Sequence, residues 1–367
     1  MTEILQATET VDVRRPESQI AASIARTFPD HIPLYACAAL FTAVTLIISF
    51  IYDTQLPWGA AAFFLGALAV FAVFALPLFA LWQLFRLWRA SAVHPAVALL
   101  SQFADTFCTG NRAGYIFHSL IIFVPLMICF AAVKDVIPFI HPFSWDTSLM
   151  RWDQATFLGH HPWEVLQPIL GFPLATASLN FLYDLWLPVM FGCLFWQAFF
   201  GANDGLRLQF LLAFSFAWFI AGNLLAVVFS SAGPCFYGFL HPGQPNPYAA
   251  QMEYLQMADS HWRIWSLDVQ NALWASYSKS AFGAVSGISA MPSMHVTSAV
   301  LMALVGWRTS RKLGLALGAF AFAIVIGSIH LAWHYAADGI AGIALALLFW
   351  WLAGHIARRW MARTTPQ

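Results

Sequence analysis

The chain has 367 residues, of which 60% are hydrophobic and only 9% are charged. Soluble domains carry about 25% charged residues, so this composition excludes a soluble domain, a disordered chain, a coiled coil and a disulfide-rich secreted scaffold. Lys plus Arg and Asp plus Glu number 17 each, so no net charge attracts nucleic acid. The composition predicts an all-α, polytopic membrane protein.

A membrane-spanning helix needs about 20 predominantly apolar residues, and eight long uncharged runs approach that length. Their ranges are about 33–52, 58–85, 114–133, 181–201, 208–230, 292–307, 313–330 and 336–356. The fourth run has the weakest signal, because Asp184 lies near its start and Pro188 interrupts it. The polar N-terminus has no apolar stretch behind a basic start, so we expect no cleaved signal peptide.

The basic residues separate clearly between the two sides of these eight helices. If the N-terminus is cytoplasmic, four lie outside, namely Lys134, Arg151, Arg263 and Lys279. The other 13 lie inside: Arg14, Arg15, Arg26, Arg86, Arg89, Arg112, Arg207, Arg308, Arg311, Lys312, Arg358, Arg359 and Arg363. Cytoplasmic loops carry an excess of Lys and Arg, so both termini are predicted to be cytoplasmic.

Two long segments, 134–180 and 231–291, are predicted on the outer side. They carry the tryptophans Trp145, Trp152, Trp163, Trp262, Trp265 and Trp274. Because Trp prefers the headgroup level of a bilayer, these segments are expected to lie along the outer leaflet. They act there either as interfacial anchors or as a lid over a lipid-binding cleft.

Ionisable residues at membrane depth are functional candidates by default, and here they gather at the outer ends of the last three helices. His295 begins the sixth helix and His330 ends the seventh, while His334 and Asp338 begin the eighth. Residues i and i+4 share a helical face, so Asp338 can accept a hydrogen bond from His334. That bond leaves the other ring nitrogen as a nucleophile, and His295 can then protonate a departing alkoxide.

Simpler interpretations stay open for several of these polar residues. A histidine near a helix end is usually a hydrogen-bonded interfacial residue, and we interpret His118 and His355 in this way. Asp184 is expected to make a structural hydrogen bond. His330 and His334 have a spacing that also suits a metal or haem ligand pair, which would indicate a transporter or a metal-binding membrane protein. The five cysteines show no zinc-binding spacing.

The first turn of the sixth helix is a candidate phosphate site. Pro292 suits a first helical position, and the backbone N–H groups of that turn could hold a phosphate. Phosphoryl transfer needs little more than a nucleophile, an acid and charge stabilisation.

The C-terminal motifs resemble those of the type-2 phosphatidic acid phosphatase superfamily of membrane lipid phosphatases and phosphotransferases. Pro292-Ser293-Met294-His295 stands in the place of its Pro-Ser-Gly-His motif, and His334 with Asp338 matches its His-x-x-x-Asp motif. The form His334-Tyr335-Ala336-Ala337-Asp338 is similar to the inositol phosphorylceramide synthase branch. Similarity at the level of motifs covers about 287–342.

This resemblance implies a six-helix core and a metal-independent phosphohistidine mechanism. In that mechanism His334 is the nucleophile, His295 the general acid and base, and Asp338 the residue that orients His334. The implied domain organisation is a tail at 1–30, two extra helices and a basic loop at 31–111, the catalytic core at 112–357 and a tail at 358–367.

The sequence departs from the family pattern where phosphate-clamping arginines are expected. Gly327 and Ser328 replace a Ser-Arg pair, and the outer end of the fifth helix reads SSAGPCFY over 230–237 in place of the first motif. Lys134 copies that motif's spacing to His141-Pro142, but we interpret this as chance because it lies in another loop. Arg151, Arg263 or Lys279 could substitute, and Lys279 ranks first because it is nearest in sequence to His295.

The sequence therefore predicts a membrane enzyme that cleaves a lipid phosphate ester and transfers the phosphoryl-bearing group to water or to an alcohol. We expect no cofactor, no nucleic-acid partner, and a bacterial inner-membrane location with the site on the periplasmic or lumenal face. The catalytic residues expected are His295, His334 and Asp338. The expected substrate-binding residues are Ser293, Lys279, His330 and Tyr237.

Overall fold

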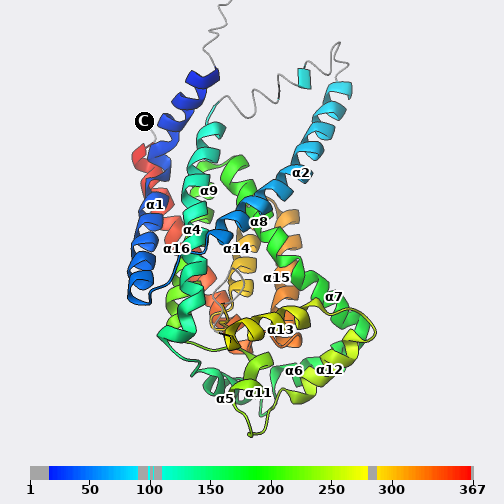
Figure 1. The fold of residues 1–367 in the computed structure, drawn as a ribbon. Coiled ribbons are helices and arrows are strands. Elements are labelled where there is room, and N and C mark those ends of the chain that lie inside the picture. The colour runs from blue at the N-terminus through cyan, green and yellow to red at the C-terminus, as the bar shows by residue number, and fades with distance from the viewer. Residues whose placement is uncertain (1–15, 90–97, 100–101, 103–109, 280–286, 365–367) are drawn as a thin grey trace, which may run out of the picture.

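The computed structural model describes residues 16–89, 98–99, 102, 110–279 and 287–364, and these residues form an all-α protein with no strand. The helices of the predicted membrane segments form one bundle (Figure 1). Its members are α1 (Pro16–Ile51), α2 (Trp58–Arg89), α4 (Arg112–Ile140), α7 (Pro173–Asp184), α8 (Trp186–Phe200), α9 (Asp204–Phe216), η1 (Ala217–Leu225), α10 (Ala226–Val228), α14 (Met294–Thr309), α15 (Arg311–His330) and α16 (Ala336–Thr364).

Each of the eight predicted membrane segments coincides with a helix or a run of consecutive helices. Among the described residues, seven such stretches are long and apolar enough to cross a membrane, with α7 and α8 counting as one and α9 to α10 as another. The eighth segment, α14, is a helix of 16 residues. It is short because Ser293 caps its start and the chain turns at Ser310, and it packs against α8, α9, α15 and α16.

Four boundaries differ from the predicted ones by seven residues or more. Helix α16 ends at Thr364 rather than near 356, so most of the predicted C-terminal tail is helical. Helix α1 begins at Pro16 rather than near 33, so the described part of the N-terminal tail is helical. Helix α4 continues to Ile140, because Val136, Ile137 and Pro138 stay buried and extend its packed face, and Lys134 is therefore a helix residue rather than a loop residue. The fourth segment begins at Pro173 and is divided at Leu185.

The start of α1 and the end of α16 lie at the same end of the bundle (Figure 1), where Trp360 Nε1 donates a 2.9 Å hydrogen bond to the carbonyl oxygen of Pro29. This arrangement agrees with an even number of crossings. Which end is cytoplasmic stays a prediction, and Arg14, Arg15 and Cys108 lie outside the described residues.

The two long segments predicted on the outer side fold as short helices at the opposite end of the bundle (Figure 1). The first contains α5 (Asp146–Thr156) and α6 (Pro162–Leu170). The second contains η2 (Pro234–Phe236), α11 (Tyr237–Leu240), α12 (Ala249–Asp259) and α13 (Trp265–Ser278). Trp145, Trp152, Trp262 and Trp265 are exposed there, as interfacial anchors would be.

The two N-terminal helices attach to the bundle differently. Helix α1 packs along α4 and α9, where the buried guanidinium of Arg207 lies 3.8 Å from the ring centroid of Tyr115 and donates a hydrogen bond to His31. Helix α2 instead leaves most of its surface uncovered and diverges from the bundle toward its C-terminal end (Figure 1). Apolar space therefore remains between α2 and its neighbours.

Candidate active site

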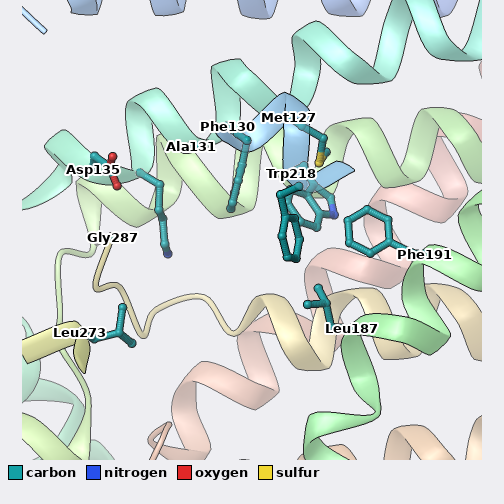
Figure 2. Close-up of a pocket in the computed structure, with 12 residues that line it drawn as sticks. Met127, Phe130, Ala131, Asp135, Leu187, Phe191, Trp218, Leu273 and Gly287 are labelled. Carbon is teal, nitrogen blue, oxygen red and sulfur yellow. The ribbon is translucent and has the colours of Figure 1, made fainter. Parts of the chain in front are cut away.

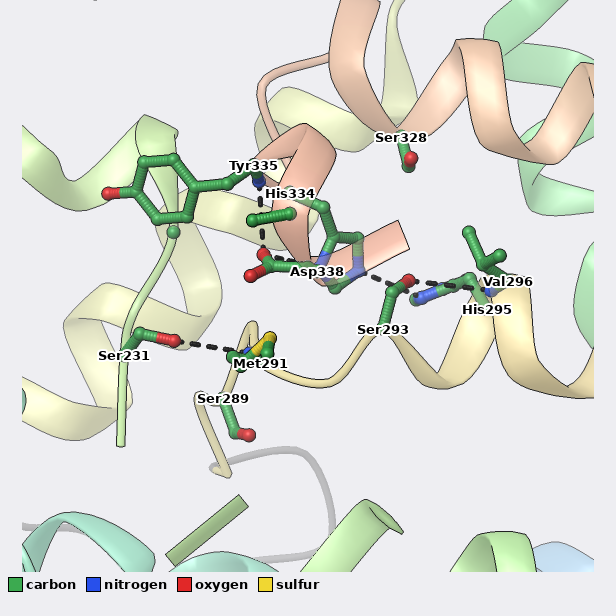
Figure 3. A network of polar contacts seen from close by, with 12 residues as sticks. Ser231, Ser289, Met291, Ser293, His295, Val296, Ser328, His334, Tyr335 and Asp338 are labelled. Carbon is green, nitrogen blue, oxygen red and sulfur yellow. Dashed lines mark hydrogen bonds and ion pairs between the residues drawn. The ribbon is translucent and has the colours of Figure 1, made fainter. Parts of the chain in front are cut away.

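Three predicted residues from two separate stretches of sequence meet at the end of the bundle that carries the short helices. His334 Nδ1 lies 3.3 Å from Asp338 Oδ2, and His334 Nε2 lies 3.5 Å from His295 Nδ1 (Figure 3). A carboxylate only accepts hydrogen bonds, so we assign the His334 proton to Nδ1. The lone pair on Nε2 then faces His295, in the arrangement of a nucleophile with an orienting carboxylate behind it.

His334 and Asp338 do not lie on one helix as predicted. Helix α16 begins at Ala336, and His334 belongs to the turn between α15 and α16. Asp338 is in the first turn, and its Oδ2 accepts a 3.0 Å hydrogen bond from the backbone N–H of Tyr335. A carboxylate in the first turn satisfies N–H groups that the helix leaves without partners, so the Asp338 side chain folds back toward His334. The pair is close for this reason rather than through i, i+4 helical spacing.

The environment of His334 favours its neutral form. The side chain is 5% exposed. This burial, together with the charge of Lys134, lowers the pKa of His334 from 6.5 to about 3. A hydrogen bond with the backbone of Ala290 acts in the opposite direction and raises that pKa. Desolvation disfavours the charged form of an imidazole. Burial therefore favours the neutral imidazole, which is the form that can act as a nucleophile.

His295 is held by aromatic rings in the first turn of α14. Its ring lies 4.6 Å from the ring centroid of Tyr183 and 4.1 Å from that of Trp186. Trp186 is fixed by a 2.7 Å hydrogen bond from Nε1 to Ser298 Oγ. Ser293 Oγ caps the helix by accepting from the backbone N–H of Val296 (Figure 3). Pro292 lies before this cap rather than at the first helical position.

Two buried aspartates of α5, which the sequence analysis did not single out, hold the backbone around the site. Asp146 accepts hydrogen bonds from the backbone N–H groups of Ala232 and Gly233 and from the hydroxyl of Tyr335. Asp153 accepts from the backbone N–H groups of Ala336 and Ala337. Positions 146 and 153 are two helical turns apart on one face of α5, and this spacing of two carboxylates was the available signal.

A pocket with a volume of about 280 Å³ opens beside the two histidines. Its walls come from α4, α8, η1, the segment from 287 to 295 and the second outer segment, which contributes Ala232, Phe236 and Leu273. Lys134 is the one Lys or Arg among the described lining residues. The pocket borders the π-helical η1 through Trp218, and π-helical turns are frequent at functional sites.

Lys134 was assigned to an outer loop in the sequence analysis, and that assignment was wrong. It belongs to α4, and its Nζ lies 3.5 Å from the carbonyl oxygen of Ser289, on the segment that leads to His295. A lysine within an apolar helix is costly and is a functional candidate by default. The sequence analysis dismissed Lys134 as a chance match because the predicted helix ended at residue 133, which placed the lysine in a loop.

The four expected substrate-binding residues do not line this pocket. Ser293 is buried as the cap of α14, and Lys279 is exposed at the end of α13. Tyr237 packs on the ring of His241 and in a small cluster with Tyr248. His330 Nε2 bonds Thr176 Oγ1 at 2.9 Å, and its ring packs on Tyr254.

The alternative metal site made of His330 and His334 is not assembled. His330 contacts α7 and α12, whereas His334 contacts Asp338 and His295. Within the described ranges, no three His, Cys, Asp or Glu side chains form a group that could hold a metal ion.

Comparison with known protein families matches a family model to most of the region just described, although Lys134 and Asp146 precede the match. The model of the PAP2 superfamily matches residues 147–352, more than half of the chain. The protein belongs to the PAP2 superfamily, and this membership supports a function of the lipid phosphatase or phosphotransferase type. Searches of curated proteins and of solved structures returned no match.

Proposed function

We propose that this protein is a membrane lipid phosphotransferase or phosphatase that works through a phosphohistidine at His334. The proposal rests on one observation above all. Neutral His334 is held by Asp338 on one ring nitrogen and faces His295 with the other. This is the geometry that nucleophilic attack on phosphorus, followed by protonation of a leaving oxygen, requires.

The proposed reaction has two steps. The Nε2 lone pair of His334 attacks phosphorus, and the bond from phosphorus to the diacylglycerol oxygen breaks. His295 donates a proton to that oxygen, while Asp338 balances the positive charge on the phosphorylated imidazole. In the second step His295 removes a proton from water or an alcohol, which attacks phosphorus and releases His334.

Lys134 is proposed to take the part that the missing family arginines play. Charge stabilisation is the main catalytic need in phosphoryl transfer, and Lys134 brings a cation to the pocket that His295 and His334 also line. In the first turn of α14, which the sequence suggested as a phosphate site, the N–H group of Val296 is already bonded to Ser293 Oγ.

The acceptor is proposed to be an alcohol, as in inositol phosphorylceramide synthases. The support is the His-Tyr-x-x-Asp form of the motif, in which Tyr335 has a structural use. Its hydroxyl donates a 2.9 Å hydrogen bond to Asp146, which links the nucleophile's neighbour to an outer helix. A phosphodiester donor also carries less charge than a monoester, which suits a pocket with one described cation.

The test is to trap the covalent intermediate in purified protein. Dioleoyl phosphatidic acid labelled with ³²P and phosphatidylinositol labelled with ³H in the inositol ring are supplied separately, with and without EDTA. We expect protein-bound label that is stable to alkali and labile to acid, as a phosphoramidate is. His334→Ala should lose it, and His355→Ala, which changes a partly exposed histidine of α16 outside the catalytic pocket, should retain it.

The two labels also separate the two activities. Release of inorganic phosphate from phosphatidic acid identifies a phosphatase, and transfer of labelled phosphoinositol to added ceramide identifies a synthase-like phosphotransferase. No acid-labile label from either donor, with lipids left unchanged, would refute the proposed function.

A further inference from the structure

The pocket beside His334 continues into an apolar passage that the catalytic chemistry does not use. A neighbouring cavity of about 270 Å³ shares Phe130, Lys134 and Trp218 with the catalytic pocket. It reaches α2 at Ala60 and Phe63 and α8 at Phe191. Figure 2 shows the rings of Phe130, Trp218 and Phe191 along this cavity, with Leu187 across from them.

A third cavity continues the passage along α2. It has a volume of about 690 Å³ and shares Phe63, Leu187 and Phe191 with the second one. Its α2 wall is a stripe at helical spacing that consists of Phe63, Gly66, Ala67, Val70, Phe71, Phe74, Ala75 and Leu78. The opposite wall is α8, at residues 187, 188, 191 and 192. We call this third cavity the α2–α8 groove.

We propose that the α2–α8 groove binds a hydrocarbon chain of the lipid substrate while its phosphate lies between Lys134 and His334. The inference rests on the proposed function and extends it to a substrate subsite. The groove is built in part by α2, which precedes the region that the family model matches.

Polarity along the passage supports this occupant. The groove lining is entirely apolar, and polar groups enter only where the second cavity brings in Lys134 and Asp135 and the catalytic pocket brings in the histidines. This order, from an apolar channel to a charged end, matches a lipid that carries a phosphate headgroup. Ordinary surface lipids contact every outer helix equally and need no connection to the histidines.

The length of the groove also fits a lipid chain. Phe63 and Leu78 are roughly 22 Å apart along α2, at about 1.5 Å of rise per residue. Half the hydrocarbon thickness of a bilayer is about 15 Å. A chain that starts near the catalytic pocket can therefore lie in the groove over the full depth of one leaflet.

Two glycines allow the groove to be filled without disturbing the fold. A Cβ added at Gly66 or at Gly192 would meet no atom within 4 Å, and both residues line the groove. Gly318 on α15 is equally open and lines none of the three cavities. Gly66→Phe and Gly192→Phe are thus the blocking variants, and Gly318→Phe is the matched control.

The first measurement compares dioleoyl with dihexanoyl phosphatidic acid as substrates. We expect each blocking variant to lower the ratio of kcat/KM for the long ester to that for the short ester by at least tenfold. Gly318→Phe should leave that ratio within twofold of wild type. An unchanged ratio in both blocking variants would overturn the proposal.

The second measurement does not depend on turnover. A phosphatidic acid with a photoactivatable diazirine near the end of one acyl chain is crosslinked to the full-length protein in nanodiscs. Label is expected on peptides that span 63–78 and 187–192, reduced at least fivefold by the blocking variants and unaffected by Gly318→Phe. Label spread evenly over the outer helices would overturn the proposal. Labelling of the groove in a protein that shows no turnover would refute the proposed function, but it would still support binding of a lipid chain in the α2–α8 groove.

Discussion

Asp153 Oδ2 accepts a 2.8 Å hydrogen bond from the backbone N–H of Ala336, and this contact joins outer helix α5 to the first turn of α16. A second bond, from the N–H of Ala337 to Asp153 Oδ1, is 2.9 Å long. Because Asp338 follows directly in the same turn, the carboxylate of α5 sets where the residue that orients His334 can lie.

Asp153→Leu should therefore impair catalysis indirectly, through the backbone that holds the catalytic groups rather than through a contact with the substrate. Both N–H groups would be left buried and without partners, and a displacement of about 1 Å at the catalytic groups can cost on the order of 10² in rate. Asp153→Asn keeps one acceptor oxygen and should lose less. The measurement is kcat on a lipid phosphate, and equal, negligible losses in both variants would contradict this role.

Asp153 should also make stability depend on pH. Burial raises the pKa of Asp153 from 3.8 to about 7, against the lowering effect of its two backbone hydrogen bonds. A folded-state pKa above the unfolded value means that the native protein binds more protons. Protonation of Asp153 in the folded state therefore stabilises the native protein fully below about pH 4, and this stabilisation is lost as the pH rises toward 7. The Tm of the detergent-solubilised protein should fall across this window, and Asp153→Asn should flatten the slope.

His334→Ala and Asp338→Asn should differ in severity. In the proposed mechanism His334 is the nucleophile, so its removal would abolish the covalent step and we expect no detectable turnover. Loss of the orienting carboxylate leaves a poorly held imidazole and should cost on the order of 10²–10⁴ in kcat. Steady-state assays with a lipid phosphate measure both variants, and mild, equal losses would remove His334 from the role of nucleophile.

Lys134 should be needed for charge stabilisation. Lys134→Met keeps an unbranched chain of similar length in α4 and removes the cation, and loss of one such charge-stabilising group costs on the order of 10²–10³ in kcat. Lys279→Met serves as the comparison, because Lys279 is exposed at the end of α13. A larger effect at Lys279 than at Lys134 would restore the ranking that the sequence suggested.

Sidedness can be tested with two exposed positions at opposite ends of the bundle. After replacement of the native cysteines, Ser260→Cys, next to α12, should react with a membrane-impermeant maleimide in intact cells. Thr309→Cys, at the end of α14, should react only after the membrane is broken. Both side chains are exposed, so access to reagent is matched. The reverse pattern would overturn the predicted orientation and leave the His–Asp geometry unaffected.

Sequence reasoning located the helices well, because long apolar runs have few structural alternatives in a membrane. It also named His295, His334 and Asp338, which the fold brings together. It failed where position depends on tertiary contacts. Asp146 and Asp153 act on backbone groups more than 80 residues away, and no local pattern reveals such partners. Lys134 was dismissed because the end of its helix was misplaced by seven residues, and helix ends are the least reliable feature of sequence-based prediction.

The imidazole of His334 has different surroundings at its two nitrogens. Asp338 lies on the Nδ1 side, and the pocket that Lys134 lines opens on the Nε2 side, which faces His295. Under the proposed function, an anionic headgroup would approach the Nε2 side, where Lys134 lines the pocket, because Asp338 occupies the Nδ1 side. The charged fragment bound to His334 would then stay beside Lys134 after the neutral lipid alcohol has left.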